Sequence, residues 1–379
     1  MNESDRSPGR VPPPKTCALC DVQLGDQNDS HEHIIPQSIG GRRTVRRFIC
    51  KPCNDKTGAT WDTELFKQFH WLTVMLGTSR ESGPAKPIRV DTVSGTTYAV
   101  RPNGDISHLN PTVVPNADGN SYRIEARSVD DAKQQLKQLK RRYPALDIEQ
   151  ALSTAIASSR PVNEVFKTSF EFGGEYAGRS MVKSALALAY SLGVQPVACE
   201  LAMPFLRYAE RAPDCLAEHF DCELVRSRPT RLFNCVAVHG DGQTRRLLGY
   251  IEYFGVCRWV VHMSKEYDGP DIRGVYCIDG ITGEAVPLDV DLTMSDEGFQ
   301  ASLEGRTRDT ERWLAAVNAA MLLVRQRRSE LSRAANVDFA ISAACAAMGV
   351  RPDDPLDDEQ QQEFLGRVER MLVDGLVPR

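Results

Sequence analysis

The chain has 379 residues, enough for two or three domains with a sizeable hydrophobic core. Its hydrophobic fraction of 41% and charged fraction of 26% are those of an ordinary globular protein. The net charge of −5 argues against a protein that binds polyanions over its whole surface. The sequence has no apolar run of about 18 residues that could span a membrane, and its first residues have no apolar core typical of a signal peptide. We therefore expect a cytoplasmic protein with no membrane partner.

The chain begins with a Ser-, Pro- and Arg-rich stretch, residues 1–14, which predicts a disordered tail. Two CxxC pairs follow, Cys17 with Cys20 and Cys50 with Cys53. Paired CxxC motifs at this separation predict a tetrahedral zinc site made of four cysteines. Because four thiolates fill the coordination sphere, that zinc is expected to be structural, and any chemistry must lie between the pairs.

Between the pairs lies the segment Glu32-His33-Ile34-Ile35-Pro36, and Asn54 directly follows the last cysteine. A neutral imidazole, with an ordinary pKa of roughly 6.5, can take a proton from water at physiological pH. A carboxylate and an amide oxygen suit a hard cation such as Mg²⁺ better than thiolates do. The residue types therefore favour metal-assisted hydrolysis over the alternative, a zinc ribbon without chemistry.

Basic residues crowd the same region, although the chain as a whole is acidic. They are predicted to contact nucleic-acid phosphates, because such contact needs local positive charge only; the alternative is a solvated basic loop. The six residues are Arg42, Arg43, Arg46, Arg47, Lys51 and Lys56.

Taken together, these elements resemble the HNH endonuclease family, in the subgroup whose ββα-metal domain is held by two CxxC knuckles. The resemblance covers roughly residues 15–80 and rests on several elements in the same order and spacing. The matching positions are Cys17, Cys20, Glu32, His33, Ile34, Ile35, Pro36, Gly40, Gly41, Cys50, Cys53 and Asn54.

The resemblance implies a role for each matching polar residue. It makes His33 the general base and makes Glu32 and Asn54 ligands of a catalytic Mg²⁺ or Mn²⁺ ion. For His31, an exposed residue beside the site is favoured over an extra ligand. One departure is clear: the family's middle asparagine is missing, and Thr44 or Val45 stands where it is expected.

After the second CxxC pair, apolar residues at helical spacing predict a helix that continues to Gly77. Short strands are predicted over residues 88–126 and a helix over 178–192, on which Arg179 and Lys183 are expected at the surface. Alternating strands over 229–290 predict an antiparallel meander, and helical segments follow. The fold class is therefore α+β, with a zinc-stabilised HNH domain at 15–80.

The larger region, residues 85–379, is expected to be a mixed α+β body for targeting, sensing or oligomerisation, with a sub-boundary near 225. The leading interpretation is a metal-dependent DNA endonuclease that nicks or cuts both strands, in restriction, phage defence or a mobile element. Cutting both strands would suit a homodimer. Two alternatives stay open, namely an RNA-cleaving effector and a non-catalytic, zinc-stabilised nucleic-acid-binding module.

Overall fold

The computed structural model describes residues 16–109, 112–115, 121–125, 129–153, 162, 164–207 and 215–376. The predicted disordered tail at residues 1–14 lies outside them. Two compact units form: Met1–Ala85 packs with Phe170–Arg325, and Lys86–Ser169 packs with Gln326–Arg379. The expected division into an HNH domain at residues 15–80 and a separate body from residue 85 stays a prediction. Residues 170–325 form one compact unit with the N-terminal segment.

The N-terminal segment of the first unit is a ββα arrangement, as the sequence predicts. Strands β1 (Asp29–His33) and β2 (Thr44–Cys50) pair antiparallel, and the short 3₁₀ turn η1 (Gln37–Ile39) lies between them. Helix α1 (Lys51–Thr57) then runs through a widened π turn, η2 (Gly58–Asp62), into α2 (Thr63–Leu76). Gly77 ends this helix at the predicted place, with a positive φ of 64° that a residue without Cβ adopts at no steric cost.

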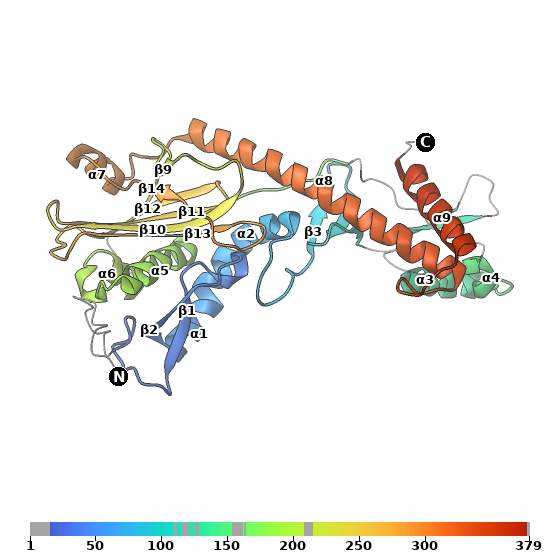
Figure 1. The fold of residues 1–379 in the computed structure, drawn as a ribbon, viewed down its shortest axis with the longest axis horizontal. Coiled ribbons are helices and arrows are strands. Elements are labelled where there is room, and N and C mark those ends of the chain that lie inside the picture. The colour runs from blue at the N-terminus through green and yellow to red at the C-terminus, as the bar shows by residue number, and fades with distance from the viewer. Residues whose placement is uncertain are drawn as a thin grey trace. The chain divides into compact units, whose positions relative to one another are not determined.

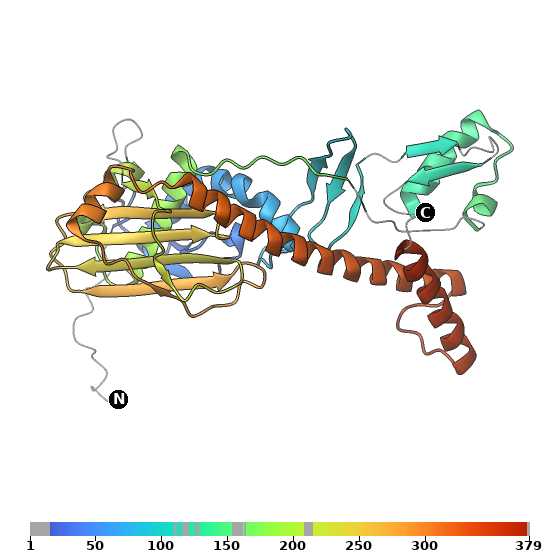
Figure 2. The same ribbon diagram turned by 90° about the horizontal axis from the view of Figure 1, so that it is seen from above.

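A five-stranded antiparallel sheet forms the centre of the first unit. Its three consecutive strands over residues 233–264 form a meander as predicted, whereas the next predicted strand, Ile272–Asp279, pairs with the first of these three and not with the third. The strand order of the sheet is β13-β10-β11-β12-β8. Figure 2 shows these strands lying side by side. The strands are β8 (Leu216–Glu218), β10 (Phe233–Asp241), β11 (Arg246–Tyr253), β12 (Cys257–Ser264) and β13 (Ile272–Asp279).

Both faces of this sheet are covered (Figure 1). Helix α5 (Glu175–Ser191) lies on one face, followed by η3 (Pro196–Ala198) and α6 (Ala202–Arg207). A Cβ on Gly249 of β11 would lie 2.8 Å from the Cβ of Ala185 in α5, so the missing side chain permits the close approach of helix and sheet. The other face meets β9 (Val225–Arg226), β14 (Asp289–Val290) and α7 (Asp296–Leu303).

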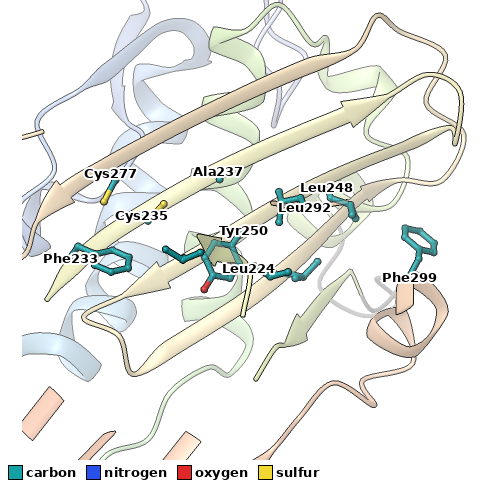
Figure 3. Close-up of a cluster of buried hydrophobic side chains, with 11 residues drawn as sticks. Leu224, Phe233, Cys235, Ala237, Leu248, Tyr250, Cys277, Leu292 and Phe299 are labelled. Carbon is teal, nitrogen blue, oxygen red and sulfur yellow. The ribbon is translucent and has the colours of Figure 1, made fainter. Parts of the chain in front are cut away.

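The hydrophobic cluster on that second face draws alternate residues from neighbouring strands, as a pleated sheet requires. Phe233, Cys235 and Ala237 come from β10, and Leu248 and Tyr250 from β11 (Figure 3). Because apolar side chains pack on both faces of the sheet, the sequences of its long strands are nearly continuous runs of apolar residues.

The second unit contains two small antiparallel sheets, the end of a long helix and three further helices. Its strands are β3 (Ile88–Asp91), β4 (Thr97–Val100), β5 (Ile106–His108), β6 (Thr112–Pro115) and β7 (Tyr122–Glu125). Its helices are α3 (Val129–Arg142), α4 (Ile148–Ser153), α9 (Asp358–Leu376) and the part of α8 (Thr310–Met348) beyond Arg325.

Arg328 of α8 joins two elements of this second unit. Its guanidinium donates to the carbonyl oxygens of Arg101 and Gly104, each at 2.8 Å. Gly104 has a φ of 104°, and a Cβ there would lie 2.2 Å from the Leu331 carbonyl oxygen, so only glycine fits. Within the described ranges, no helix is both long and apolar enough to cross a membrane.

His262 makes the stability of the first unit depend on pH. Its side chain is fully buried in β12, with Nε2 3.0 Å from the Ser302 hydroxyl and the ring edge-on to Phe299. The pKa of His262 is lowered to about 4, mainly by burial and in addition by the nearby His219 and Arg246. Because the unfolded histidine has a pKa of roughly 6.5, the unfolded chain binds more protons between those two values.

We therefore expect the free energy of unfolding to fall as pH drops from about 6.5 towards 4, by on the order of 3 kcal/mol from His262 alone. Replacing His262 with Gln should remove that part of the pH dependence, and urea unfolding at pH 7.5 and 5.0 measures it. The exposed His31→Gln variant is the control. Identical pH dependence in the wild type and His262→Gln would contradict the assignment.

Candidate active site

The four cysteines of the CxxC pairs converge, as predicted. Cys17 and Cys20 lie in the turn that precedes β1, while Cys50 ends β2 and Cys53 lies in the first turn of α1. Their Sγ atoms all lie within 4.8 Å of one another, and those of Cys20 and Cys50 are 3.7 Å apart. Tetrahedral zinc with bonds of about 2.3 Å separates its sulfurs by roughly 3.8 Å.

Backbone groups also favour a charged sulfur at this cluster. The amide groups of Leu19 and Cys50 donate to Cys17 Sγ at 3.4 and 3.3 Å, and such hydrogen bonds stabilise thiolate ligands. The cluster therefore fits a structural zinc ion that ties the turn before β1 to the junction of β2 and α1.

A pocket of about 250 Å³ lies beside this cluster, and all three predicted catalytic residues line it. Glu32 and His33 come from the end of β1, and Asn54 comes from α1. Asp62, from the π turn, adds a second carboxylate to its wall. The ββα arrangement thus brings together residues that are more than twenty positions apart, because β1 and α1 pack against each other.

Glu32 is buried, with a side chain only 3% exposed, and has a cationic partner. Its Oε1 lies 2.7 Å from the Nζ of Lys183 in α5. The same Nζ lies 2.7 Å from Oδ2 of Asp62, whose Oδ1 accepts a 2.6 Å hydrogen bond from Ser180. One ammonium ion therefore lies between two carboxylates at the base of the pocket.

Burial raises the pKa of Glu32 to about 7, with Lys183 opposing the rise and Asp62 adding to it. For Lys183, burial alone would lower the pKa, but Glu32 and Asp62 outweigh this effect and the net shift is upward. Lys183 is consequently an ammonium ion over the physiological range, and it favours the ionised form of Glu32.

His33 is half-buried, and its Nε2 lies 3.7 Å from Oε2 of Glu81. Burial lowers the pKa of His33, against the opposing influence of Glu81. The neutral imidazole, the form that can accept a proton, is therefore favoured near neutral pH. Thr44 and Val45, which stand where the middle asparagine is expected, are the β2 partners of His33 and Glu32.

Asn54 lies on the helical side of the pocket. Its side-chain amide donates weakly, at 3.5 Å, to the backbone carbonyl of His31. Its amide oxygen and the Glu32 carboxylate form a donor set of oxygens, which fits a hard divalent cation such as Mg²⁺. The His31 side chain is exposed and is not among the described residues that line the pocket.

The six predicted phosphate-binding residues lie around the ββα segment, and none is among the described residues that line the pocket. Arg42 donates to the Thr282 carbonyl at 2.6 Å, and the Arg43 guanidinium lies over the Tyr276 ring. Arg46 and Arg47 pair with Asp29 and Asp26 at 3.1 and 3.3 Å. Lys51 pairs with Asp55 at 3.2 Å, and Lys56 is exposed on α1.

Sequence reasoning missed three residues of this site: Asp62, Glu81 and Lys183. Lys183, expected at the surface, is instead 1% exposed, and the neighbouring Arg179 is 6% exposed. The Arg179 guanidinium donates to the Phe205 carbonyl at 3.1 Å and pairs with Glu175 at 3.0 Å. The expectation was wrong because α5 is covered by the sheet on one side and by the ββα segment on the other.

A ββα unit with four converging cysteines, and with a polar pocket between its first strand and its helix, agrees with the ββα-metal arrangement expected from the sequence. Residues 17–70 match a family described as HNH endonuclease. No curated protein and no solved structure was found to match the chain.

The expected structural role of the four-cysteine cluster predicts that folding of the ββα segment depends on zinc. Replacing Cys50 with Ser should remove the zinc and unfold this segment, because zinc binding contributes on the order of 10 kcal/mol to folding at comparable sites. Metal analysis of the purified protein should give one zinc per wild-type chain and none for Cys50→Ser. Cys345→Ser, a buried cysteine of the second unit, is the control. A folded, zinc-free Cys50→Ser protein would contradict the structural role.

Proposed function

We propose that the protein is a metal-dependent endonuclease that hydrolyses phosphodiester bonds of DNA. The observation that carries this proposal is the shared pocket of Glu32, His33 and Asn54, in a segment that matches the HNH endonuclease family. These residues supply, in one place, a proton acceptor and two oxygen donors for a cation. Phosphodiester hydrolysis needs both functions.

In this mechanism, His33 takes a proton from the attacking water. Its lowered pKa supports this role, because the imidazole is then neutral at physiological pH. Glu32 and Asn54 would hold a Mg²⁺ or Mn²⁺ ion. When bound, that ion stabilises the negative charge that develops on the phosphoryl oxygens and on the leaving 3′ oxygen. Glu81, 3.7 Å from His33, is placed to orient the imidazole and to stabilise its protonated form.

The mechanism predicts that His33→Ala removes cleavage while leaving the fold intact, because the His33 side chain is only half-buried and is not part of the buried core. Loss of a general base lowers the rate by about 10²- to 10⁴-fold. Supercoiled plasmid incubated with Mg²⁺, Mn²⁺ or EDTA measures this rate, and linear or nicked product shows whether one strand or both are cut.

The matched control is His31→Ala, an exposed histidine two residues earlier on the same strand, which should cut at the wild-type rate. Equal cutting by His33→Ala and wild type would contradict the assigned base. Metal-dependent cutting of transcripts but not plasmid would point to RNA as the substrate. Binding without cutting of either would point to a non-catalytic module.

We propose that the six basic residues contact the phosphate backbone, with Lys51 and Lys56 as the clearest candidates. Both are exposed on α1, the helix that also carries Asn54. The Lys51–Asp55 pair is exposed as well, so it costs little to separate. By contrast, the Arg42 guanidinium is already engaged by a backbone carbonyl.

The Lys51→Ala/Lys56→Ala double variant should weaken DNA binding and reduce the slope of log affinity against log salt by about 2, one for each lost phosphate contact. Binding is measured by fluorescence anisotropy in the His33→Ala background, so that the DNA stays intact. Lys67→Ala, an exposed lysine on α2, is the control. An unchanged salt slope in the double variant would remove both lysines from the interface.

A further inference from the structure

The Lys183 ammonium makes its three contacts entirely within the segment that matches the nuclease family, although Lys183 itself lies far outside it. Its Nζ meets Glu32 Oε1 of β1 and Asp62 Oδ2 of the π turn, each at 2.7 Å. Thr57 Oγ1 of α1 lies at 3.4 Å. An ammonium group has three N–H donors, so these three oxygens account for all of them.

A buried cation is a costly way to join two elements. Removing an ammonium ion from water costs several kcal/mol, and well-packed apolar residues often stabilise such a contact as well as a buried ion pair does. Packing of α5 against the ββα segment would therefore not by itself require a lysine here. What distinguishes the lysine is that it fixes one oxygen of Glu32, a residue in the wall of the pocket.

Lys183 contacts Glu32 at the wall of the pocket. The closest approach of its Nζ is to Oε1, so Lys183 restrains the orientation of the carboxylate group. Asp62 is held in turn by Ser180 and by Lys183. When both carboxyl groups are ionised, they and the one ammonium carry a net charge of −1, so this cluster attracts a cation although it contains a lysine.

We propose that Lys183 is a positioning residue for the divalent cation of the nuclease site. It fixes the Glu32 carboxylate so that the second oxygen can ligate the cation, and Asp62 offsets its charge. The cation site is thus completed by helix α5. This inference rests on the proposed metal-dependent function, and it names the part of the chain outside the HNH segment that the site needs.

The test is Mn²⁺ binding to the full-length protein, followed by the electron paramagnetic resonance signal of free Mn²⁺. Binding that is lost in Glu32→Gln defines the site. Lys183→Met has a similar length and no charge, and it should bind Mn²⁺ about ten- to a hundredfold more weakly, the usual effect of losing a residue that orients a metal ligand. Asp62→Asn should also weaken Mn²⁺ binding, because the lysine charge is then no longer offset.

Ser184→Ala is the matched control. Ser184 is the next residue of α5 and is also fully buried, but its hydroxyl meets that of Tyr253 on the sheet at 3.3 Å. This variant should bind Mn²⁺ as the wild type does. Zinc content and circular dichroism show whether each variant is folded. If Lys183→Met does not fold, Asp62→Asn decides the question, because the Asp62 side chain is 21% exposed and its replacement is nearly isosteric.

Unchanged or tighter Mn²⁺ binding by folded Lys183→Met would overturn the proposal; tighter binding would mean that the ammonium ion competes with the cation. Unchanged binding by Asp62→Asn would also overturn it, as would a wild-type protein with no Glu32-dependent Mn²⁺ site. Because Mn²⁺ binding is measured without nucleic acid, its result does not depend on cleavage. The proposed nuclease function can therefore be contradicted while the role of Lys183 stands. A wild-type protein that binds Mn²⁺ through Glu32 but cuts no substrate would contradict the nuclease activity alone.

Discussion

A buried ammonium ion between two carboxylates is the interaction on which the arrangement of the first unit depends. Lys183 has to reach Glu32 and Asp62 because an unpaired charge at that depth would destabilise the fold by several kcal/mol. This requirement fixes how α5 lies against the ββα segment. On its other side α5 packs closely on the sheet at Gly249. Sheet, helix and pocket are therefore three consecutive layers, and the position of each constrains the next.

Much of the ββα segment could be predicted from sequence because its signals are local. CxxC spacing specifies a ligand geometry regardless of the rest of the fold, and the four sulfurs do converge. The helix that ends at Gly77 and the antiparallel meander follow from periodicity and turn residues, which act over a few positions. The convergence of Glu32, His33 and Asn54 on one pocket follows from the same segment, because β1 and α1 pack against each other.

The rest of the site depends on contacts between residues far apart in the chain, for which the sequence has no local signal. Arg179 and Lys183, two basic residues one turn apart, usually indicate a solvated helix face. Here an entire stretch of α5, from Ala177 to Tyr190, is buried. In the same way, the Arg42 guanidinium reaches a carbonyl 240 residues away. Periodicity cannot reveal a helix that is covered on both sides, because its polar residues are paired inside the fold.

The distance along the chain between the partners of the buried ion pair has a consequence for synthesis. Lys183 follows Asp62 by 121 residues, so a ribosome making about 5 to 20 residues per second produces the nuclease segment several seconds before its partner helix. During that interval the carboxylates of Glu32 and Asp62 have no ammonium ion beside them. A nascent chain therefore contains both CxxC pairs several seconds before the helix that completes the pocket has been made.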